Sequence, residues 1–236
     1  MRPTWSILAG ALLALGACLT SPGDMSATQH DLAAAQEEQA AAAHEKLYRP
    51  GAVAPVEECG ASHPGIEDGC WMSAANPTER QLREAREHLR RAAEHRRASA
   101  ALRAAEVRAC AGIPEHDVDT SPFEHTDQIA KVERIGAPGR AGGAAVTFKP
   151  MAGMTQERMQ RLVDCQLARD AALGHVVPEM PDCPLVPRGV VAAVSLVDGA
   201  VVVRVTSKDA VVAEEIFSRA EVDLPSPATP AGGAQF

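Results

Sequence analysis

Hydrophobic positions are spaced differently in the two halves of the chain. Over residues 25–48 and 76–111 most of them are alanine, set among glutamate, glutamine and arginine, which is typical of helices that bury little surface. Beyond residue 129, β-branched residues alternate with polar ones in short runs, as in strands. The pattern predicts a helical arm over 25–128, an α+β domain over 129–224 and a disordered tail over 225–236.

The arm is expected to contain two helices separated by a cysteine loop. The first helix covers Met25–Tyr48, and the prolines and glycine of Arg49–Val56 end it. The second begins at Asn76, which suits the N-cap with Glu79 at N3, and continues to Ala111. A narrow seam at heptad-like spacing predicts that the second helix pairs with the first. The seam consists of Leu82, Ala85, Leu89 and Ala92.

Two histidines of the second helix, His88 and His95, lie seven residues apart and share one face. Histidines that chelate one ion from a single helix are spaced four apart. The pair is therefore expected to belong to a solvated basic face, and a metal pair is the alternative.

The domain over 129–224 is expected to have the order β-β-α-β-β-α, an α+β sandwich of one sheet covered by two helices. In chain order the elements are strands at Ile129–Ile135 and Ala144–Lys149, a helix at Thr155–Leu173, strands at Val190–Val197 and Ala200–Thr206, and a helix at Ala210–Val222. From residue 144 the order resembles a ferredoxin-like fold that lacks its final strand. The strand Ile129–Ile135 would then occupy the place of that final strand. The resemblance concerns architecture and implies no activity.

The first 17 residues have the features of a secretory signal peptide. Arg2 precedes the apolar stretch Trp5–Leu15, which is too short to span a bilayer as a permanent helix. The run Leu15-Gly16-Ala17-Cys18 resembles the lipobox of bacterial lipoproteins. The alternative is ordinary signal cleavage beside a cysteine that stays unmodified.

The lipobox resemblance implies that Cys18 becomes the first mature residue and carries fatty acyl chains such as palmitate. Several chains on one cysteine hold a protein stably on a membrane, and residues 18–24 would be the lipidated tether. The resemblance also implies an exported protein that faces the periplasm. Leu19, after the cysteine, favours the outer membrane over the inner one.

The net charge and the sequence motifs argue against several classes of function. The net charge of −8 argues against a nucleic-acid partner, whose phosphates need a basic face. No nucleophile-elbow motif or phosphate-binding glycine loop is present, so neither an enzyme nor a cofactor is expected. An envelope protein remains as the expected partner, beside the membrane itself.

Five cysteines remain after Cys18, and an exported protein can form disulfides. Cys59 and Cys70 enclose a short loop with no regular pattern, and a disulfide there would contribute about 2–3 kcal/mol by the chain-entropy model. The alternative for this loop is a metal site with His63.

The other three cysteines are Cys110, Cys165 and Cys183, and a disulfide between Cys165 and Cys183 is favoured. Cys110 is the alternative partner of either. A set of soft ligands, namely Cys165, His175, Met180 and Cys183, is the metal-binding alternative. The fold resemblance extends to heavy-metal-associated domains, but their cysteine pair is missing over Pro150–Thr155.

Together these patterns predict a lipid-anchored envelope protein with a structural or partner-binding role. A periplasmic metal-binding protein that uses the four soft ligands is the alternative.

Overall fold

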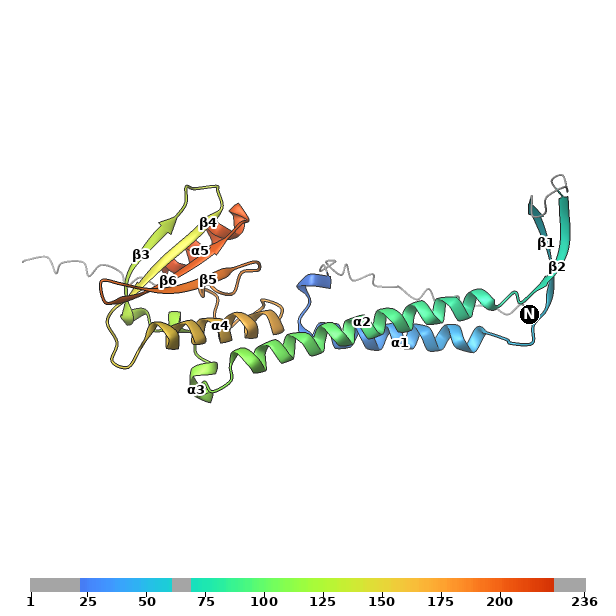
Figure 1. Ribbon diagram of the computed structural model, residues 1–236, viewed down its shortest axis with the longest axis horizontal. Helices are drawn as coiled ribbons and strands as arrows, with labels where there is room; N and C mark the ends of the chain where they lie inside the picture. Colours follow the sequence, from blue (N-terminus) through green and yellow to red (C-terminus); the bar gives the residue numbers. More distant parts are fainter. Residues whose placement is uncertain (1–21, 61–68, 223–236) are drawn as a thin grey trace, which may run out of the picture.

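A computed structural model describes residues 22–60 and 69–222 (Figure 1). The predicted signal peptide, Cys18 and the tail over 225–236 lie outside these residues. Figure 1 shows a long rod of helices that carries a β-sheet at one end and a β-hairpin at the other. Within the described residues, no helix is both long enough and apolar enough to cross a membrane.

The rod is built around an antiparallel pair of helices, α1 (Ala27–Leu47) and α2 (Glu79–Ala109). Small buried residues recur every seven positions in both helices, so the two backbones can approach closely. They are Ala27, Ala34 and Ala41 in α1, and Ala85, Ala92 and Ser99 in α2. At 1.5 Å per residue, the 31 residues of α2 span about 46 Å. The predicted pairing of the two helices is therefore present.

A side-chain cap sets where α1 begins, whereas the N-cap residue of α2 makes no side-chain cap hydrogen bond. Ser26 and Gln29 form a capping box at the start of α1, with Gln29 N donating to Ser26 Oγ at 3.1 Å. In α2 the expected cap residue, Asn76, instead closes the preceding turn, because its Oδ1 accepts from Thr78 N at 2.8 Å. Regular helix therefore begins later than predicted, at Glu79, with Thr78 as the N-cap.

The segment between α1 and α2 contains a two-stranded antiparallel hairpin, β1 (Ala54–Gly60) and β2 (Gly69–Ala75). Its ladder places Cys59 opposite Cys70, and the two are joined by a disulfide. The sequence prediction favoured this bond but missed both strands. A strand with Pro55 and two adjacent glutamates has no alternating apolar face to reveal it.

The rest of the chain is an α+β unit with one sheet. Its main elements are β3 (Ile129–Ile135), β4 (Gly142–Phe148), α4 (Gln156–Ala172), β5 (Val191–Val197), β6 (Ala200–Ser207) and α5 (Ala210–Val222). The short helix α3 (Glu115–Val118) and 3-10 turns at Pro122–Glu124 and Thr126–Gln128 lead into the sheet, and a third 3-10 turn, η1, covers Pro22–Asp24. The strand order is β3-β4-β6-β5, with every neighbouring pair antiparallel. The predicted α+β class is confirmed.

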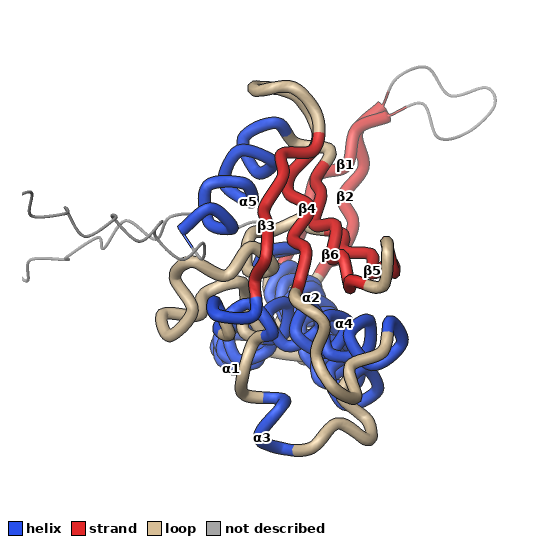
Figure 2. The backbone as a smooth tube through the Cα atoms, turned by 90° about the vertical axis from the view of Figure 1, so that its left-hand side faces the viewer, coloured by secondary structure: helices blue, strands red, loops and turns tan. Residues whose placement is uncertain are grey.

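Helices cover one face of this sheet. The buried side chains form one cluster that includes Val146 of β4, Val203 of β6, Val163 of α4 and Ile216 of α5. Arg204, which points the other way from Val203, is exposed. Figure 2 shows α5 beside the strands and α4 beneath them. The core therefore lies between the sheet and these two helices.

Both edges of the four-stranded sheet are protected. On β5, Val194 N donates to Gln160 Oε1 at 2.8 Å, and Val194 O accepts from Gln156 Nε2 at 3.0 Å. On β3, Lys131 and Glu133 form an ion pair of 2.7 Å. Side-chain capping and edge charges discourage the pairing of a further strand at either edge.

Candidate functional site

A disulfide ties the helix pair to the α+β unit. Cys110, which follows the last residue of α2, is bonded to Cys165 in α4. The favoured pairing of Cys165 with Cys183 is therefore wrong. It failed because α4 packs against α2, a contact between distant segments that cysteine spacing does not reveal. Cys183 is buried elsewhere, with its Sγ 3.3 Å from Ser121 Oγ.

The start of α1 lies against the loop that follows α4. Gly174 has φ +75°, and a Cβ there would come within 2.9 Å of Ser26 N. A glycine is therefore needed for this approach. The next residue, His175, also has a positive φ, and its Nδ1 lies 2.8 Å from Val186 O. A carbonyl only accepts hydrogen bonds, so Nδ1 of His175 is the donor in this contact.

These contacts border a cavity of about 660 Å³, which we name the junction pocket. It is lined by three histidines from three segments: His30 of α1, His95 of α2 and His175. Met25, Leu102 and several alanines supply apolar lining. Its volume lies within the range of small-ligand sites, and convergent polar groups in a largely apolar wall are typical of them.

His30 and His95 are in direct contact inside this pocket. Their Nδ1 atoms lie 2.9 Å apart. His30 is buried, and burial together with the neighbouring His95 lowers its pKa. His30 therefore favours the neutral form, in which one ring nitrogen donates and the other accepts.

The contact belongs to a series of polar layers between α1 and α2. His88 Nδ1 lies 2.6 Å from Glu37 Oε2, and His44 Nδ1 lies 2.8 Å from Gln81 Oε1. The expectation that His88 and His95 form a solvated face is wrong, because both contact residues of α1. The signal that could have found them is the shared spacing of seven over 30, 37 and 44 and over 81, 88 and 95.

Glu37 anchors the middle layer. It also accepts a hydrogen bond from Arg91 Nε at 3.0 Å. Burial opposes ionisation of Glu37, but the hydrogen bonds from His88 and Arg91 outweigh it and lower its pKa. Glu37 is therefore a carboxylate that holds two side chains of α2.

The structure does not bring the four predicted soft ligands together as one metal site. The sulfur of Cys165 is bonded to Cys110, and metal binding needs a thiolate. Met180 Sδ accepts from Gln166 Nε2 at 3.7 Å, and His175 contacts Val186. Of this set, His175 alone lines the junction pocket.

A buried carboxyl group, Asp170, lies close to the same loop. Its Oδ1 accepts from Gln166 Nε2 at 3.0 Å, and its Oδ2 has no hydrogen-bond partner among the described residues. Burial raises the pKa of Asp170 to about 6, against the opposing effects of the Gln166 hydrogen bond and the Arg169 charge. Nothing in the sequence prediction pointed to this group.

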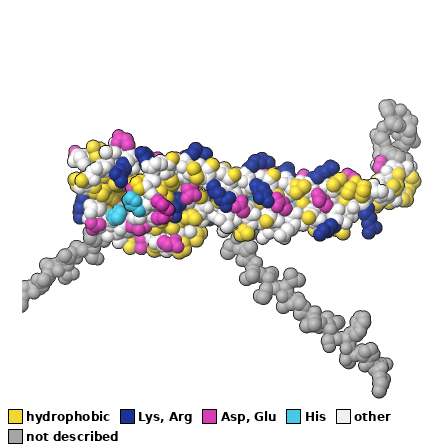
Figure 3. Space-filling model, turned by 90° about the horizontal axis from the view of Figure 1, so that it is seen from below, with side chains coloured by type: hydrophobic (Ala, Val, Ile, Leu, Met, Phe, Trp, Pro, Cys, Tyr) yellow, Lys and Arg dark blue, Asp and Glu magenta, His cyan; other side chains and the backbone are white. Residues whose placement is uncertain are grey.

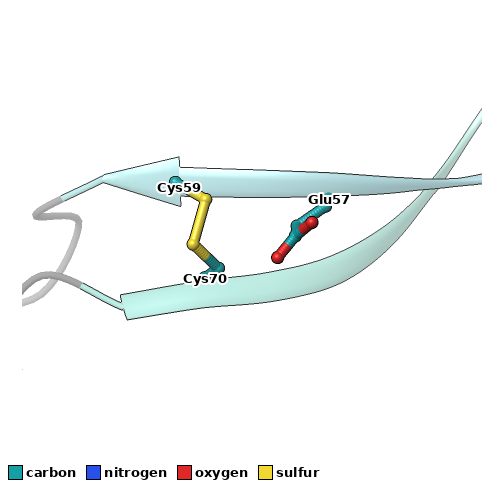
Figure 4. A group of neighbouring side chains, drawn as sticks. All are labelled: Glu57, Cys59 and Cys70. Carbon is teal, nitrogen blue, oxygen red and sulfur yellow. A yellow bond between two sulfur atoms is a disulfide. The ribbon is translucent and has the colours of Figure 1, made fainter.

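Glu57, Cys59 and Cys70 bring potential metal-ligand atoms close together at the hairpin (Figure 4). Their two sulfurs are bonded to each other and offer no thiolate. His63, the third member of the alternative metal loop, lies outside the described residues. The two cysteines therefore join β1 to β2 covalently.

The surface has mixed charge. On the face seen in Figure 3, basic and acidic side chains alternate along the helices and neither sign forms a broad patch. Ion pairs between the helices, such as Arg96 with Glu38 at 2.7 Å, account for part of this mixture.

Comparison of the chain with known protein families, with curated proteins and with solved structures found no match. Its function is therefore argued from the geometry above.

Proposed function

We propose that this chain is a lipid-anchored protein of the bacterial envelope whose helix pair holds the β1–β2 hairpin out to a protein partner. The lipobox-like run ending at Cys18 supports the anchor. The position and chemistry of the hairpin support the partner.

The observation that carries the proposal is the open edge of β2. The segment Gly69–Ala75 contains no charged residue and no proline. Met72 on this strand is 65 % exposed. An uncharged open edge can add a strand from another chain, with main-chain hydrogen bonds supplying affinity and exposed side chains supplying specificity.

The hairpin is built to remain folded while it is exposed. A two-stranded hairpin is marginally stable on its own. Here the Cys59–Cys70 disulfide closes it at one end and the helix pair holds it at the other. Such a support keeps the β2 edge ordered before a partner binds, which lowers the entropic cost of binding.

The anchor would attach near the opposite end of the helix pair. Four peptide bonds separate Cys18 from Pro22, so the acylated residue lies within about 14 Å of η1. Arg188 holds Asp24 of η1 through an ion pair of 3.1 Å. The hairpin then lies about one α2 length, ~46 Å, from the anchored junction.

We also infer that the α+β unit is ferredoxin-like, with β3 in the place of the final strand. The order β3-β4-β6-β5 and the antiparallel neighbours support this inference. The single core shared by α4 and α5 supports it too. The arrangement concerns architecture and carries no activity.

The test places a photo-crosslinking amino acid at position 72 of the full chain in cells. Irradiation should give a discrete crosslinked protein. The same amino acid at position 211, which is 78 % exposed on α5, serves as the matched control and should give none. The product should also disappear when Cys59→Ser and Cys70→Ser are combined.

Two results would contradict the proposal. One is the absence of any product from position 72 in an envelope that contains the protein at normal level. The other is a product of equal yield from both positions, which would indicate chance collisions.

A further inference from the structure

We propose that the contact between His30 and His95 is acid-sensitive: when both rings are protonated, the start of α1 separates from α2, while the rest of the helix pair stays closed. The two rings meet between the helices, beside the loop that follows α4. This behaviour would be independent of the hairpin and of its partner.

The geometry of the contact accommodates one charged ring but not two. His30 Nδ1 and His95 Nδ1 lie 2.9 Å apart, so one nitrogen donates and the other accepts. A first extra proton can enter at the outer nitrogen of the donor ring, and the hydrogen bond remains. When both rings are charged, each Nδ1 carries a hydrogen and neither can accept. Because His30 is only 5 % exposed, water screens the two like charges poorly.

The carboxylates beside this contact are already engaged. Asp31 adjoins His30 in α1, and two further acidic residues line the junction pocket. Each of the three forms an ion pair with an arginine, the pairs being Asp31 with Arg103, Glu94 with Arg90 and Asp24 with Arg188. Arg91, also in the lining, is paired with Glu37. A second proton on the histidines would therefore have to compete with an arginine for each of these carboxylates.

The remaining neighbours also favour an uncharged His30. His175, on the loop after α4, lines the same pocket and uses its Nδ1 to donate to Val186 O, so it supplies no negative charge. Burial and the adjacent His95 lower the pKa of His30, and together they outweigh the opposing charge of Asp31.

The two polar layers nearer the hairpin should respond to acid in the opposite way. His88 Nδ1 lies 2.6 Å from Glu37 Oε2, and His44 Nδ1 lies 3.1 Å from Glu84 Oε2. A protonated imidazole beside a carboxylate gains a charge-assisted hydrogen bond. Acid would therefore open the helix pair at the junction and keep it closed toward the hairpin.

The part of α1 that would open also docks on the α+β unit. The backbone of Ser26 lies against Gly174, and Ser26 O accepts from His30 N at 3.0 Å. His30 is thus one helical turn from this docking contact, so separation of its ring from His95 would also weaken the docking. Residues 22–30 would then loosen together from the junction.

The direction of the pH dependence follows from the lowered pKa of His30. The opened chain takes up the proton first, at the ordinary histidine pKa of 6.5, so the contact contributes stability above this pH and loses it as pH falls. Asp170 titrates in an overlapping window with the opposite effect on stability. The test therefore needs a readout confined to α1.

The first experiment measures hydrogen–deuterium exchange of the detergent-solubilised full chain at pH 7.5 and pH 5.0, with protection factors corrected for the intrinsic effect of pH on exchange. Residues 26–35 should lose protection at least about tenfold, the change that uptake of one proton produces over one pH unit. Residues 36–47 of the same helix should keep their protection. Unchanged protection of 26–35, or an equal loss in both segments, would overturn the proposal.

The second experiment removes the titrating ring and keeps a hydrogen-bonding group. In His95→Asn the amide can accept from a charged His30 or donate to a neutral one, so residues 26–35 should stay protected at pH 5.0. His88→Asn, the same substitution in the next layer, is the matched control and should leave the acid response of 26–35 in place. A response that survives His95→Asn, or that His88→Asn abolishes equally, would overturn the proposal. If His95→Asn loosens the helix already at pH 7.5, the comparison of segments in the unaltered chain decides.

Discussion

Asp24 and Arg188 lie 164 positions apart in the chain and form an ion pair of 3.1 Å, supported by a hydrogen bond of 2.9 Å from Arg188 Nη2 to Asp24 O. The contact fastens the segment that leads to Cys18 onto the α+β unit. Part of the expected tether, residues 22–24, is thereby docked at the junction. If Cys18 is acylated as proposed, this contact would be the first point at which the anchor is held to the folded chain.

The first prediction concerns that anchor. Cys18→Ser removes the sulfur that acylation needs, so the protein should leave the membrane fraction or accumulate unprocessed. Fractionation followed by immunoblotting measures this. Cys183→Ser, a substitution in the α+β unit, should leave the distribution unchanged. Normal processing and membrane retention of the Cys18 variant would contradict the lipoprotein interpretation.

The second prediction concerns the disulfide between α2 and α4. Combined Cys110→Ser and Cys165→Ser should reduce the free energy of unfolding by about 2–4 kcal/mol, because the bond closes a long loop. Urea denaturation without reductant measures the loss. Peptide mapping of the unreduced protein should recover Cys110 joined to Cys165, and recovery of Cys165 joined to Cys183 would contradict the structure.

The third prediction concerns the seam of small residues. Ala34 is fully buried between the helices, so Ala34→Leu should force them apart and cost about 1–3 kcal/mol of stability. Ala42→Leu, at an exposed position of the same helix, is the control and should change stability little. Equal melting temperatures of the two variants would mean that the helices do not pack through this seam.

The fourth prediction concerns Asp170, whose pKa is raised by burial to about 6. Between pH 4 and 6 the folded state holds a proton that the unfolded state has released, so Asp170 makes stability fall as pH rises through this window. Above pH 6 the cost levels off at ~3 kcal/mol. Asp170→Asn should stabilise the protein at pH 7.5 and flatten this dependence, as measured by urea denaturation across pH 4–8. Destabilisation at pH 7.5 by this substitution would contradict it.

Regular periodicity explains which parts of the fold could be predicted. The strands around Val146 and Val203 alternate in the sequence, and Asp198-Gly199 marks the hairpin between β5 and β6, so these strands were found. Strands β1 and β2 lack such a face and were missed. They are held by cross-strand pairing and a disulfide, which local patterns do not encode.

The candidate site was harder to predict, because it depends on contacts between distant segments. His175 was noticed, but as a neighbour of Cys165 and Cys183 instead of His30 and His95. His95 was compared with His88 on its own helix, although its partner lies across the helix pair. The position of Cys165 on the face of α4 that meets α2 decided its disulfide, and spacing alone could not show this.

The polar contacts that recur every seven residues between α1 and α2 limit how the length of the helix pair can change. Alanines alone would allow α1 to slide by seven residues along α2, since Ala34 would meet another small residue. The polar contacts forbid this, because His30 would then lose His95 and Glu37 would lose His88. These contacts fix one register, and a variant that keeps it can change the distance between the α+β unit and the hairpin only by inserting or deleting whole heptads in both helices. Each such change alters the distance by about 10.5 Å.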